Sequence, residues 1–160
     1  MLEEIEVQNC LRQGCCIAPV LFNVYTCLAV ERWLVRIEDT EGVGIMIKYK
    51  QDKKLFRRYT KNACERKIAE CQIADDPAIL SSSRSGAEKA AMEYQQTNSD
   101  FGLTVSIPKT KHTITGRLVE ENDQTPVALE GGDIEMVDEY PYLGSVITSY
   151  GRMTVEVDKP

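Results

Sequence analysis

The sequence has only one histidine, His112, among its 160 residues. Serine and cysteine hydrolases need a base beside the nucleophile, and the chain has no Gly-x-Ser-x-Gly turn. It also lacks Gly-x-x-x-x-Gly-Lys-Ser/Thr and Gly-x-Gly-x-x-Gly, the sequences with which P-loop and Rossmann proteins bind phosphates. These absences argue against a triad hydrolase and against both kinds of nucleotide site.

The cysteines are not spaced for zinc, because none of them forms a Cys-x-x-Cys pair. There are six, at positions 10, 15, 16, 27, 64 and 71. Buried thiols in a reducing compartment account for them better than disulfides or a metal cluster.

The chain also has little that would direct it to or through a membrane. Its longest mostly apolar stretch, residues 17–35, contains Pro19, Asn23, Glu31 and Arg32, which predicts a buried helix and not a membrane span. The N-terminal residues 1–6 are acidic where a secretory signal is basic and then apolar. We therefore expect an intracellular protein, without a distinction between nucleus and cytoplasm.

Acidic residues outnumber basic ones overall, but the basic ones are concentrated in one segment. The formal net charge is -6, yet residues 48–67 hold nine Lys and Arg against two acids, which gives a local charge of +7. Aromatic residues are interleaved with these cations, as in segments that follow a phosphate backbone. A solvated hairpin with charged faces is the alternative.

A chain of 160 residues should be one domain or a piece of one, and its predicted helices and strands indicate the α+β class. A helix begins at Ala18-Pro19, and a basic hairpin pairs residues 44–50 with residues 54–57. A second helix starts at a capping box of Ser85 and Glu88 and stops at Gly102. Further strands are predicted at residues 103–107 and 111–115, with a hairpin of residues 127–129 and 134–137.

Asp75 and Asp76 are adjacent acids between two apolar runs, within residues 68–80. This pattern predicts a strand, a tight turn and a second strand, with both acids at the tip. Oxygen ligands of this kind suit Mg²⁺, and paired metal ions neutralise the attacking and leaving oxygens in phosphoryl transfer. On their own, however, two acids in a turn are also typical of a solvated loop.

Four stretches of the chain resemble, in the right order, the motifs of non-LTR retrotransposon reverse transcriptases. Residues 12–23 (RQGCCIAPVLFN) resemble motif B, and residues 73–76 (IADD) resemble the Ala-Asp-Asp motif C. Residues 101–105 with 108–111 (FGLTV and PKTK) are similar to motif D, and residues 142–147 (YLGSVI) to the motif that joins palm and thumb.

The resemblance implies a fold and a set of roles. The fold would be a partial polymerase palm over residues 1–139, an antiparallel sheet with helices on one face, followed by a palm-to-thumb junction and tail over 140–160. Asp75 and Asp76 would be catalytic and hold Mg²⁺, and Lys109, or else Lys111, would assist the leaving pyrophosphate. The segment Arg12, Gln13 and Gly14 would contact the template or the incoming nucleotide. RNA template and DNA primer would be the partners.

The departures from the family pattern predict a chain that is inactive by itself. The first catalytic aspartate of these enzymes lies upstream of motif B, and the eleven residues before Arg12 include no Asp. Ile73 stands where the family has an aromatic residue, and Pro77 would remove a backbone N–H from the second strand of the hairpin. The alternatives are a non-catalytic module that binds RNA or protein, and a relic of a retrotransposon without a function.

Overall fold

The first helix, α1 (Ala18–Ile37), begins as predicted with Pro19 in its first turn. The computed structural model describes residues 16–50, 63–115, 125–149 and 153–155. Burial of α1 is concentrated on one face of its C-terminal half, at Thr26, Ala29, Val30, Trp33 and Ile37, and Ala18 is buried at its start. The helix itself is therefore confirmed, but the expectation that it is buried is wrong, since Val20, Leu21 and Val35 on its other side are 58% to 62% exposed.

The second helix, α2 (Arg84–Asp100), starts two residues earlier than the predicted capping box. Ser83 is the N-cap, and its Oγ accepts a hydrogen bond of 3.1 Å from the Gly86 N–H. The predicted cap at Ser85 is wrong, because Ser85 lies inside the helix, and Glu88 accepts from Arg84 Nε at 2.9 Å instead of completing a capping box. The predicted stop at Gly102 is confirmed.

The C-terminus of α2 is closed by a Schellman motif, which explains why the helix stops at this point. Gly102 has a positive φ of 70° and donates its N–H to Ser99 O at 2.9 Å. The Leu103 N–H donates to Asn98 O at 2.8 Å. Both bonds satisfy carbonyls that the end of a helix would otherwise leave unpaired.

The core forms where α1 crosses α2, and Trp33 is its centre. The indole is fully buried, its Nε1 donates to Ala90 O at 3.0 Å, and its ring meets that of Tyr94 edge-on at 5.5 Å. Val30, Ile37, Val43 and Ala90 complete the buried cluster, and Ala69 and Ile79 pack against it. The core thus joins both helices to the strands that follow α1.

The described strands form four small sheets. Two are hairpins: β1 (Ile45–Lys50) with β2 (Ala63–Ile68), and β3 (Glu70–Ile73) with β4 (Asp76–Ile79). Two have three strands. One contains β5 (Lys111–His112), β6 (Val127–Leu129) and β7 (Gly132–Met136), and the other β8 (Glu139–Tyr142), β9 (Ser145–Thr148) and β10 (Met153–Val155).

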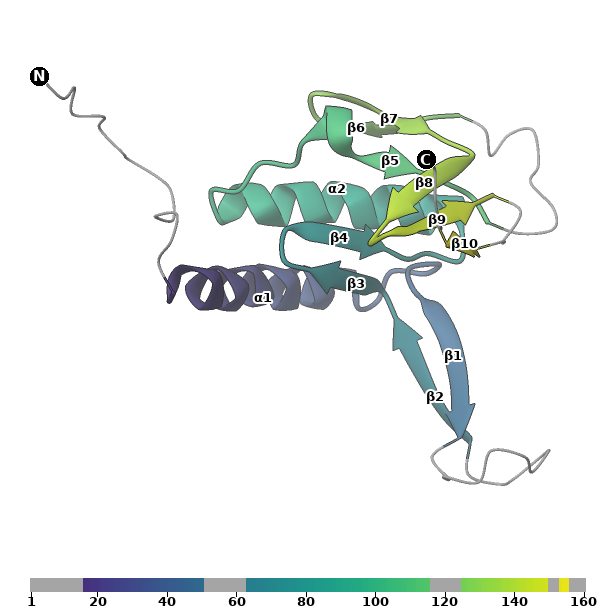
Figure 1. Cartoon of the computed structure of the whole chain (residues 1–160), viewed down its shortest axis with the longest axis horizontal. Coiled ribbons are helices and arrows are strands. Elements are labelled where there is room, and N and C mark those ends of the chain that lie inside the picture. Colours follow the sequence, from purple (N-terminus) through teal and green to yellow (C-terminus); the bar gives the residue numbers. More distant parts are fainter. Residues whose placement is uncertain (1–15, 51–62, 116–124, 150–152, 156–160) are drawn as a thin grey trace, which may run out of the picture.

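The α+β class is confirmed, but the described strands do not make one antiparallel sheet with helices on one face. Helix α2 contacts both β4 and β6, and Figure 1 shows it running between the β3–β4 hairpin and the β5–β7–β6 sheet. The pair β5–β7 is parallel. Four small sheets, two of which contact α2, therefore replace the single layer that we expected.

Two strand predictions need correction. The extended stretch at residues 103–107 is not a strand: the N–H of Leu103 belongs to the α2 cap, and Ile107 begins a short 3-10 helix, η1 (Ile107–Lys109), with Pro108 in its first turn. The partner of β1 along its whole length is β2. Residues 54–57, the predicted partner, lie outside the described residues. The hairpin of β6 with β7 is confirmed, with Val127 opposite Ile134.

Within the described residues, neither helix has the combination of length and apolarity that crossing a bilayer requires. None of the four described cysteines, at positions 16, 27, 64 and 71, forms a disulfide, but Cys16, Cys27 and Cys71 are exposed, so the expectation of buried thiols is wrong for these three.

Candidate functional site

Asp75 and Asp76 lie at the tip of the β3–β4 hairpin, where the sequence predicted them. Ile73 and Asp76 are the pair that closes a loop of two residues, Ala74 and Asp75. Ala74 has a φ of 55°, and the Gln72 amide donates to Ala74 O at 2.7 Å. Of the two loop residues only the first has a positive φ, as in a type II′ turn, the kind that suits the twist of paired strands. Both aspartates are exposed.

Pro77 does not disturb this hairpin, so the expected defect in pairing is wrong. Pro77 stands opposite Gln72, one step from the closing pair. In an antiparallel ladder, residues next to a hydrogen-bonded pair direct their N–H groups away from the partner strand. The N–H that proline lacks is therefore not one that β3 needs.

Tyr142 ties the tip to the C-terminal sheet. Its hydroxyl donates to Cys71 O at 3.1 Å and lies 3.4 Å from Asp76 O, so one phenol contacts both strands of the hairpin. Burial, and then the negative charge of Asp76, raises the pKa of Tyr142, which keeps the hydroxyl protonated and able to donate. Sequence reasoning placed Tyr142 in the junction motif but missed this contact. The expected boundary between residues 139 and 140 falls inside β8.

The lysines predicted to assist the leaving group belong to a different part of the fold. Lys109 is exposed at the end of η1, which packs on β7, and Lys111 pairs with the carboxylate of Glu135. Figure 1 shows α2 between β5 and the β3–β4 hairpin. Within the part of the chain that the structure describes, no hydrogen bond or ion pair joins either lysine to the two aspartates.

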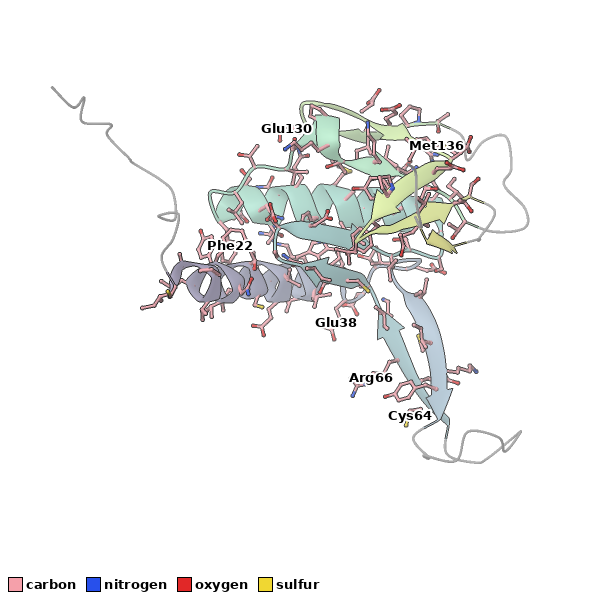
Figure 2. All side chains as sticks on the ribbon, viewed as in Figure 1. Phe22, Glu38, Cys64, Arg66, Glu130 and Met136 are labelled. Atoms are coloured by element: carbon pink, nitrogen blue, oxygen red, sulfur yellow. The ribbon has the colours of Figure 1, made fainter. Side chains whose placement is uncertain are left out.

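The remaining predicted site residues are those expected to contact the template, the incoming nucleotide or RNA. Arg12, Gln13 and Gly14 lie outside the described residues, as do five of the nine cations of the basic segment. The described part of that segment is the β1–β2 hairpin, which projects from the body in Figure 1. Figure 2 labels Cys64 and Arg66 on it, and Lys48 pairs there with Glu65 at 2.6 Å.

The carboxylate oxygens of Asp75 and Asp76 are suitable ligands for a hard cation, but two side chains do not complete its coordination. Mg²⁺ in proteins is commonly held by one or two carboxylates, with water and phosphate oxygens as the other ligands. Among the described residues, no group of three or more His, Cys, Asp or Glu side chains converges on one point. The two aspartates thus fit a magnesium ion that shares its ligands with a substrate, and not a site closed by protein alone.

A cavity of about 550 Å³ lies elsewhere, between α2, residues 103–105 and β6. Gln95 braces one wall: its amide donates to Glu130 O at 2.6 Å, and its Oε1 accepts from the Glu130 N–H at 3.0 Å. Glu130 is labelled in Figure 2. No predicted site residue lines this cavity, which the sequence did not signal.

Comparisons with protein-family models, with curated proteins and with solved structures found no match to this chain.

Proposed function

We propose that this chain carries the downstream part of a reverse-transcriptase palm, in which Asp75 and Asp76 hold Mg²⁺ for template-directed nucleotidyl transfer. The main structural support is the exposed hairpin tip, which presents the two adjacent carboxylates from a two-residue loop. A buried or dispersed pair would have been incompatible with this role. Nucleotidyl transfer is proposed as the reaction because four stretches of the chain resemble reverse-transcriptase motifs in the right order.

The contribution of the chain itself would be to hold the carboxylates still. Bound Mg²⁺ supplies charge neutralisation at the phosphoryl oxygens. The backbone of the tip is fixed by the Gln72 amide on one side and by the Tyr142 hydroxyl on the other. Carboxylates fixed in this way need not reorganise when a cation binds, and preorganisation of this kind is a large part of electrostatic catalysis.

By itself, the 160-residue chain is expected to be inactive as a polymerase. The resemblance places a further metal-binding aspartate before Arg12, and no Asp stands among those eleven residues. Metal binding and catalysis therefore require separate experiments.

The decisive experiment measures binding of Mn²⁺, a paramagnetic substitute for Mg²⁺, by the broadening of backbone amide NMR signals. Broadening should centre on residues 73–77 and disappear in the double variant Asp75→Asn, Asp76→Asn. The matched control is Asp133→Asn, which removes an exposed carboxylate from β7 and should leave the broadening unchanged. Equal broadening in the double variant and the wild type would contradict the proposal.

Primer extension on an RNA template, with the same variants, tests the expected lack of activity. Extension that requires Asp75 and Asp76 would support the assigned reaction and overturn the expectation that the chain is inactive by itself. No extension, together with Mn²⁺ at the tip, is the expected outcome.

A second candidate function is binding of RNA or an acidic protein by the basic hairpin. The observation in its favour is that β1–β2 projects from the body and exposes Arg66 and Lys67. Replacement of both by Gln, together with Lys53, Lys54, Arg57 and Arg58, should then weaken binding of a labelled RNA and flatten its salt dependence. Loss of RNA binding in that variant, without any loss on Asp75→Asn, would favour this function over the first.

A further inference from the structure

Helix α1 carries an apolar stripe on the side opposite its buried face. The stripe consists of Ile17, Leu21, Val24, Leu28 and Val35, with Glu31 between the last two. The five apolar side chains are 51% to 63% exposed, although each is of a type normally found inside a protein. Figure 1 shows α1 at the lower edge of the body, with β3, β4 and α2 above it. We call these six residues the outer stripe.

The spacing of the outer stripe is that of a helix that packs against another helix. Successive members are four, three, four, three and four residues apart, which is the a and d pattern of a heptad repeat. At 1.5 Å per residue, the stripe extends over about 27 Å of α1. Val20 and Leu34, 60% and 37% exposed, widen it on one side. The heptad pattern indicates a helical occupant.

Glu31 shows what charge that helix must carry. Its neighbours at helical spacing, three and four residues away on each side, are Cys27, Leu28, Leu34 and Val35, none of which is a cation. No ion pair to Glu31 is present among the described residues. An occupant that covers the stripe would remove water from this carboxylate, and a buried carboxylate is costly unless a positive charge accompanies it.

A second copy of α1 does not supply that charge. In a parallel pair of copies, equivalent residues face each other, so Glu31 would oppose Glu31. In an antiparallel pair, a positions face d positions, and Glu31 would oppose Leu21, Leu28 or Val35. The N-terminal segment of the chain is equally unsuited, because residues 1–9 contain three glutamates and no Lys or Arg.

We infer that the outer stripe of α1 binds an amphipathic helix of another protein, whose apolar heptad positions are interrupted by one lysine or arginine that pairs with Glu31. This inference is independent of the proposed polymerase function, since it uses neither Asp75 nor Asp76. The pairing fixes the register of the partner, because the cation must lie at one position along the stripe.

The test uses two pairs of designed peptides of about three heptads, and the members of each pair differ at one position. All have leucine at the a and d positions, except for a central core residue that is lysine in one member of the pair and glutamate in the other. In the first pair that residue is at a d position, which faces Glu31 in a parallel pair of helices, and in the second it is at an a position, for an antiparallel pair. Binding to the full-length chain is measured by fluorescence anisotropy.

The expected result is a preference that follows the charge. The wild-type chain should bind a lysine peptide about tenfold or more tightly than its glutamate counterpart, as for desolvated charge pairs at interfaces. Glu31→Lys should reverse the preference. The matched control Glu41→Lys makes the same charge change at an exposed site outside α1 and should retain it. Leu21→Glu, at an exposed position of the outer stripe, should abolish binding while circular dichroism shows unchanged helix content.

Several results would overturn the inference. One is equal affinity for both peptides or binding of neither. Another is a dimer in sedimentation that Leu21→Glu converts to monomer, because the occupant would then be a second copy. A third is binding to phosphatidylcholine and phosphatidylglycerol vesicles that Leu21→Glu abolishes, which would assign the stripe to a lipid surface.

Discussion

The two hairpins that follow α1 differ in how they are held. The β1–β2 hairpin has the longer strands, six residues each, and its described links to the body are at its root, where the Gly44 N–H donates to Leu80 O at 2.8 Å. The β3–β4 hairpin has strands of four residues but is held on several sides. Ile79 packs on the core, and Tyr142 bonds the tip.

This difference shows that the neighbours of a hairpin, more than its length, determine how firmly it is fixed. A two-stranded hairpin by itself is marginally stable in water. Regions with few buried apolar contacts open locally at lower free energy than regions tied to the core. The candidate metal site therefore lies on the hairpin that the core supports, and the basic residues lie on the one that projects.

The largest effect on this difference between the two hairpins is expected from Trp33→Ala. Trp33 is fully buried and supports the cluster on which Ile79 and Ala69 pack, so its loss should lower the free energy of unfolding by about 3–5 kcal/mol. Chemical denaturation followed by circular dichroism measures this loss. Met46→Ala, on the projecting β1, removes a side chain that is 58% exposed and should cost less than about 1 kcal/mol. Equal losses would show that the two hairpins share one core.

The next test concerns the joint between β1–β2 and the body. A Cβ on Gly86 would lie 2.4 Å from the Gly42 carbonyl carbon and 2.5 Å from its oxygen, so the backbone must move to admit alanine. Gly→Ala inside a helix normally stabilises by up to about 1 kcal/mol, whereas here we expect a loss of about 1–3 kcal/mol. The sign of the change in stability therefore shows whether the close approach of Gly86 to Gly42 is required. A more stable Gly86→Ala variant would show that this close approach is not required.

A smaller effect is expected from Tyr142→Phe, which removes the hydroxyl that bonds Cys71 O and keeps the ring. A hydrogen bond of this kind contributes about 0.5–1.5 kcal/mol net. Hydrogen exchange should become faster at the amides of β3 and β4 and stay unchanged in β1 and β2. Tyr140→Phe, in the same strand, is the matched control. If exchange in β3–β4 does not change, Tyr142 does not fix the tip.

The sequence predicted those features that depend on local chemistry. Pro19 at the start of α1, Gly102 at the end of α2 and the acids at the β3–β4 tip all follow from short-range patterns, and the structure confirms their positions. The cap of α2 was misplaced because Ser83 and Ser85 are both good N-cap residues, and the close packing of Gly86 on Gly42 favours the earlier start.

The features that the sequence did not predict depend on contacts between distant residues. The partner of β1 lies beyond the expected turn, because pairing register follows packing as well as turn residues. Nothing near Tyr142 indicates that its hydroxyl reaches the hairpin 66 to 71 residues earlier. The outer stripe was predicted to be part of a buried helix, since periodicity shows that a face is apolar without showing what covers it.

The smallest expected effect compares two glutamates, one on each hairpin. On β3, burial raises the pKa of Glu70 above its ordinary value of 4.5, and its Oε2 is buried without a hydrogen-bond partner among the described residues. On β1–β2, Glu65 is exposed and pairs with Lys48 at 2.6 Å. Burial thus disfavours the charged form of Glu70, whereas the charge of Glu65 is paired with that of Lys48.

The pH dependence follows from the direction of the shift. A raised pKa means that the folded state binds the proton more tightly than the unfolded state, so Glu70 contributes most to stability below pH 4.5. That contribution falls as the pH rises through the folded pKa. Glu70→Gln should therefore give a small gain in the thermal midpoint at pH 7, and the gain should disappear as the pH approaches 4. Glu65→Gln should give no gain at pH 7, because it removes the partner of Lys48. A lower midpoint for Glu70→Gln at pH 7 would mean that the charged carboxylate is stabilised on β3, and the two hairpins would then not differ in this respect.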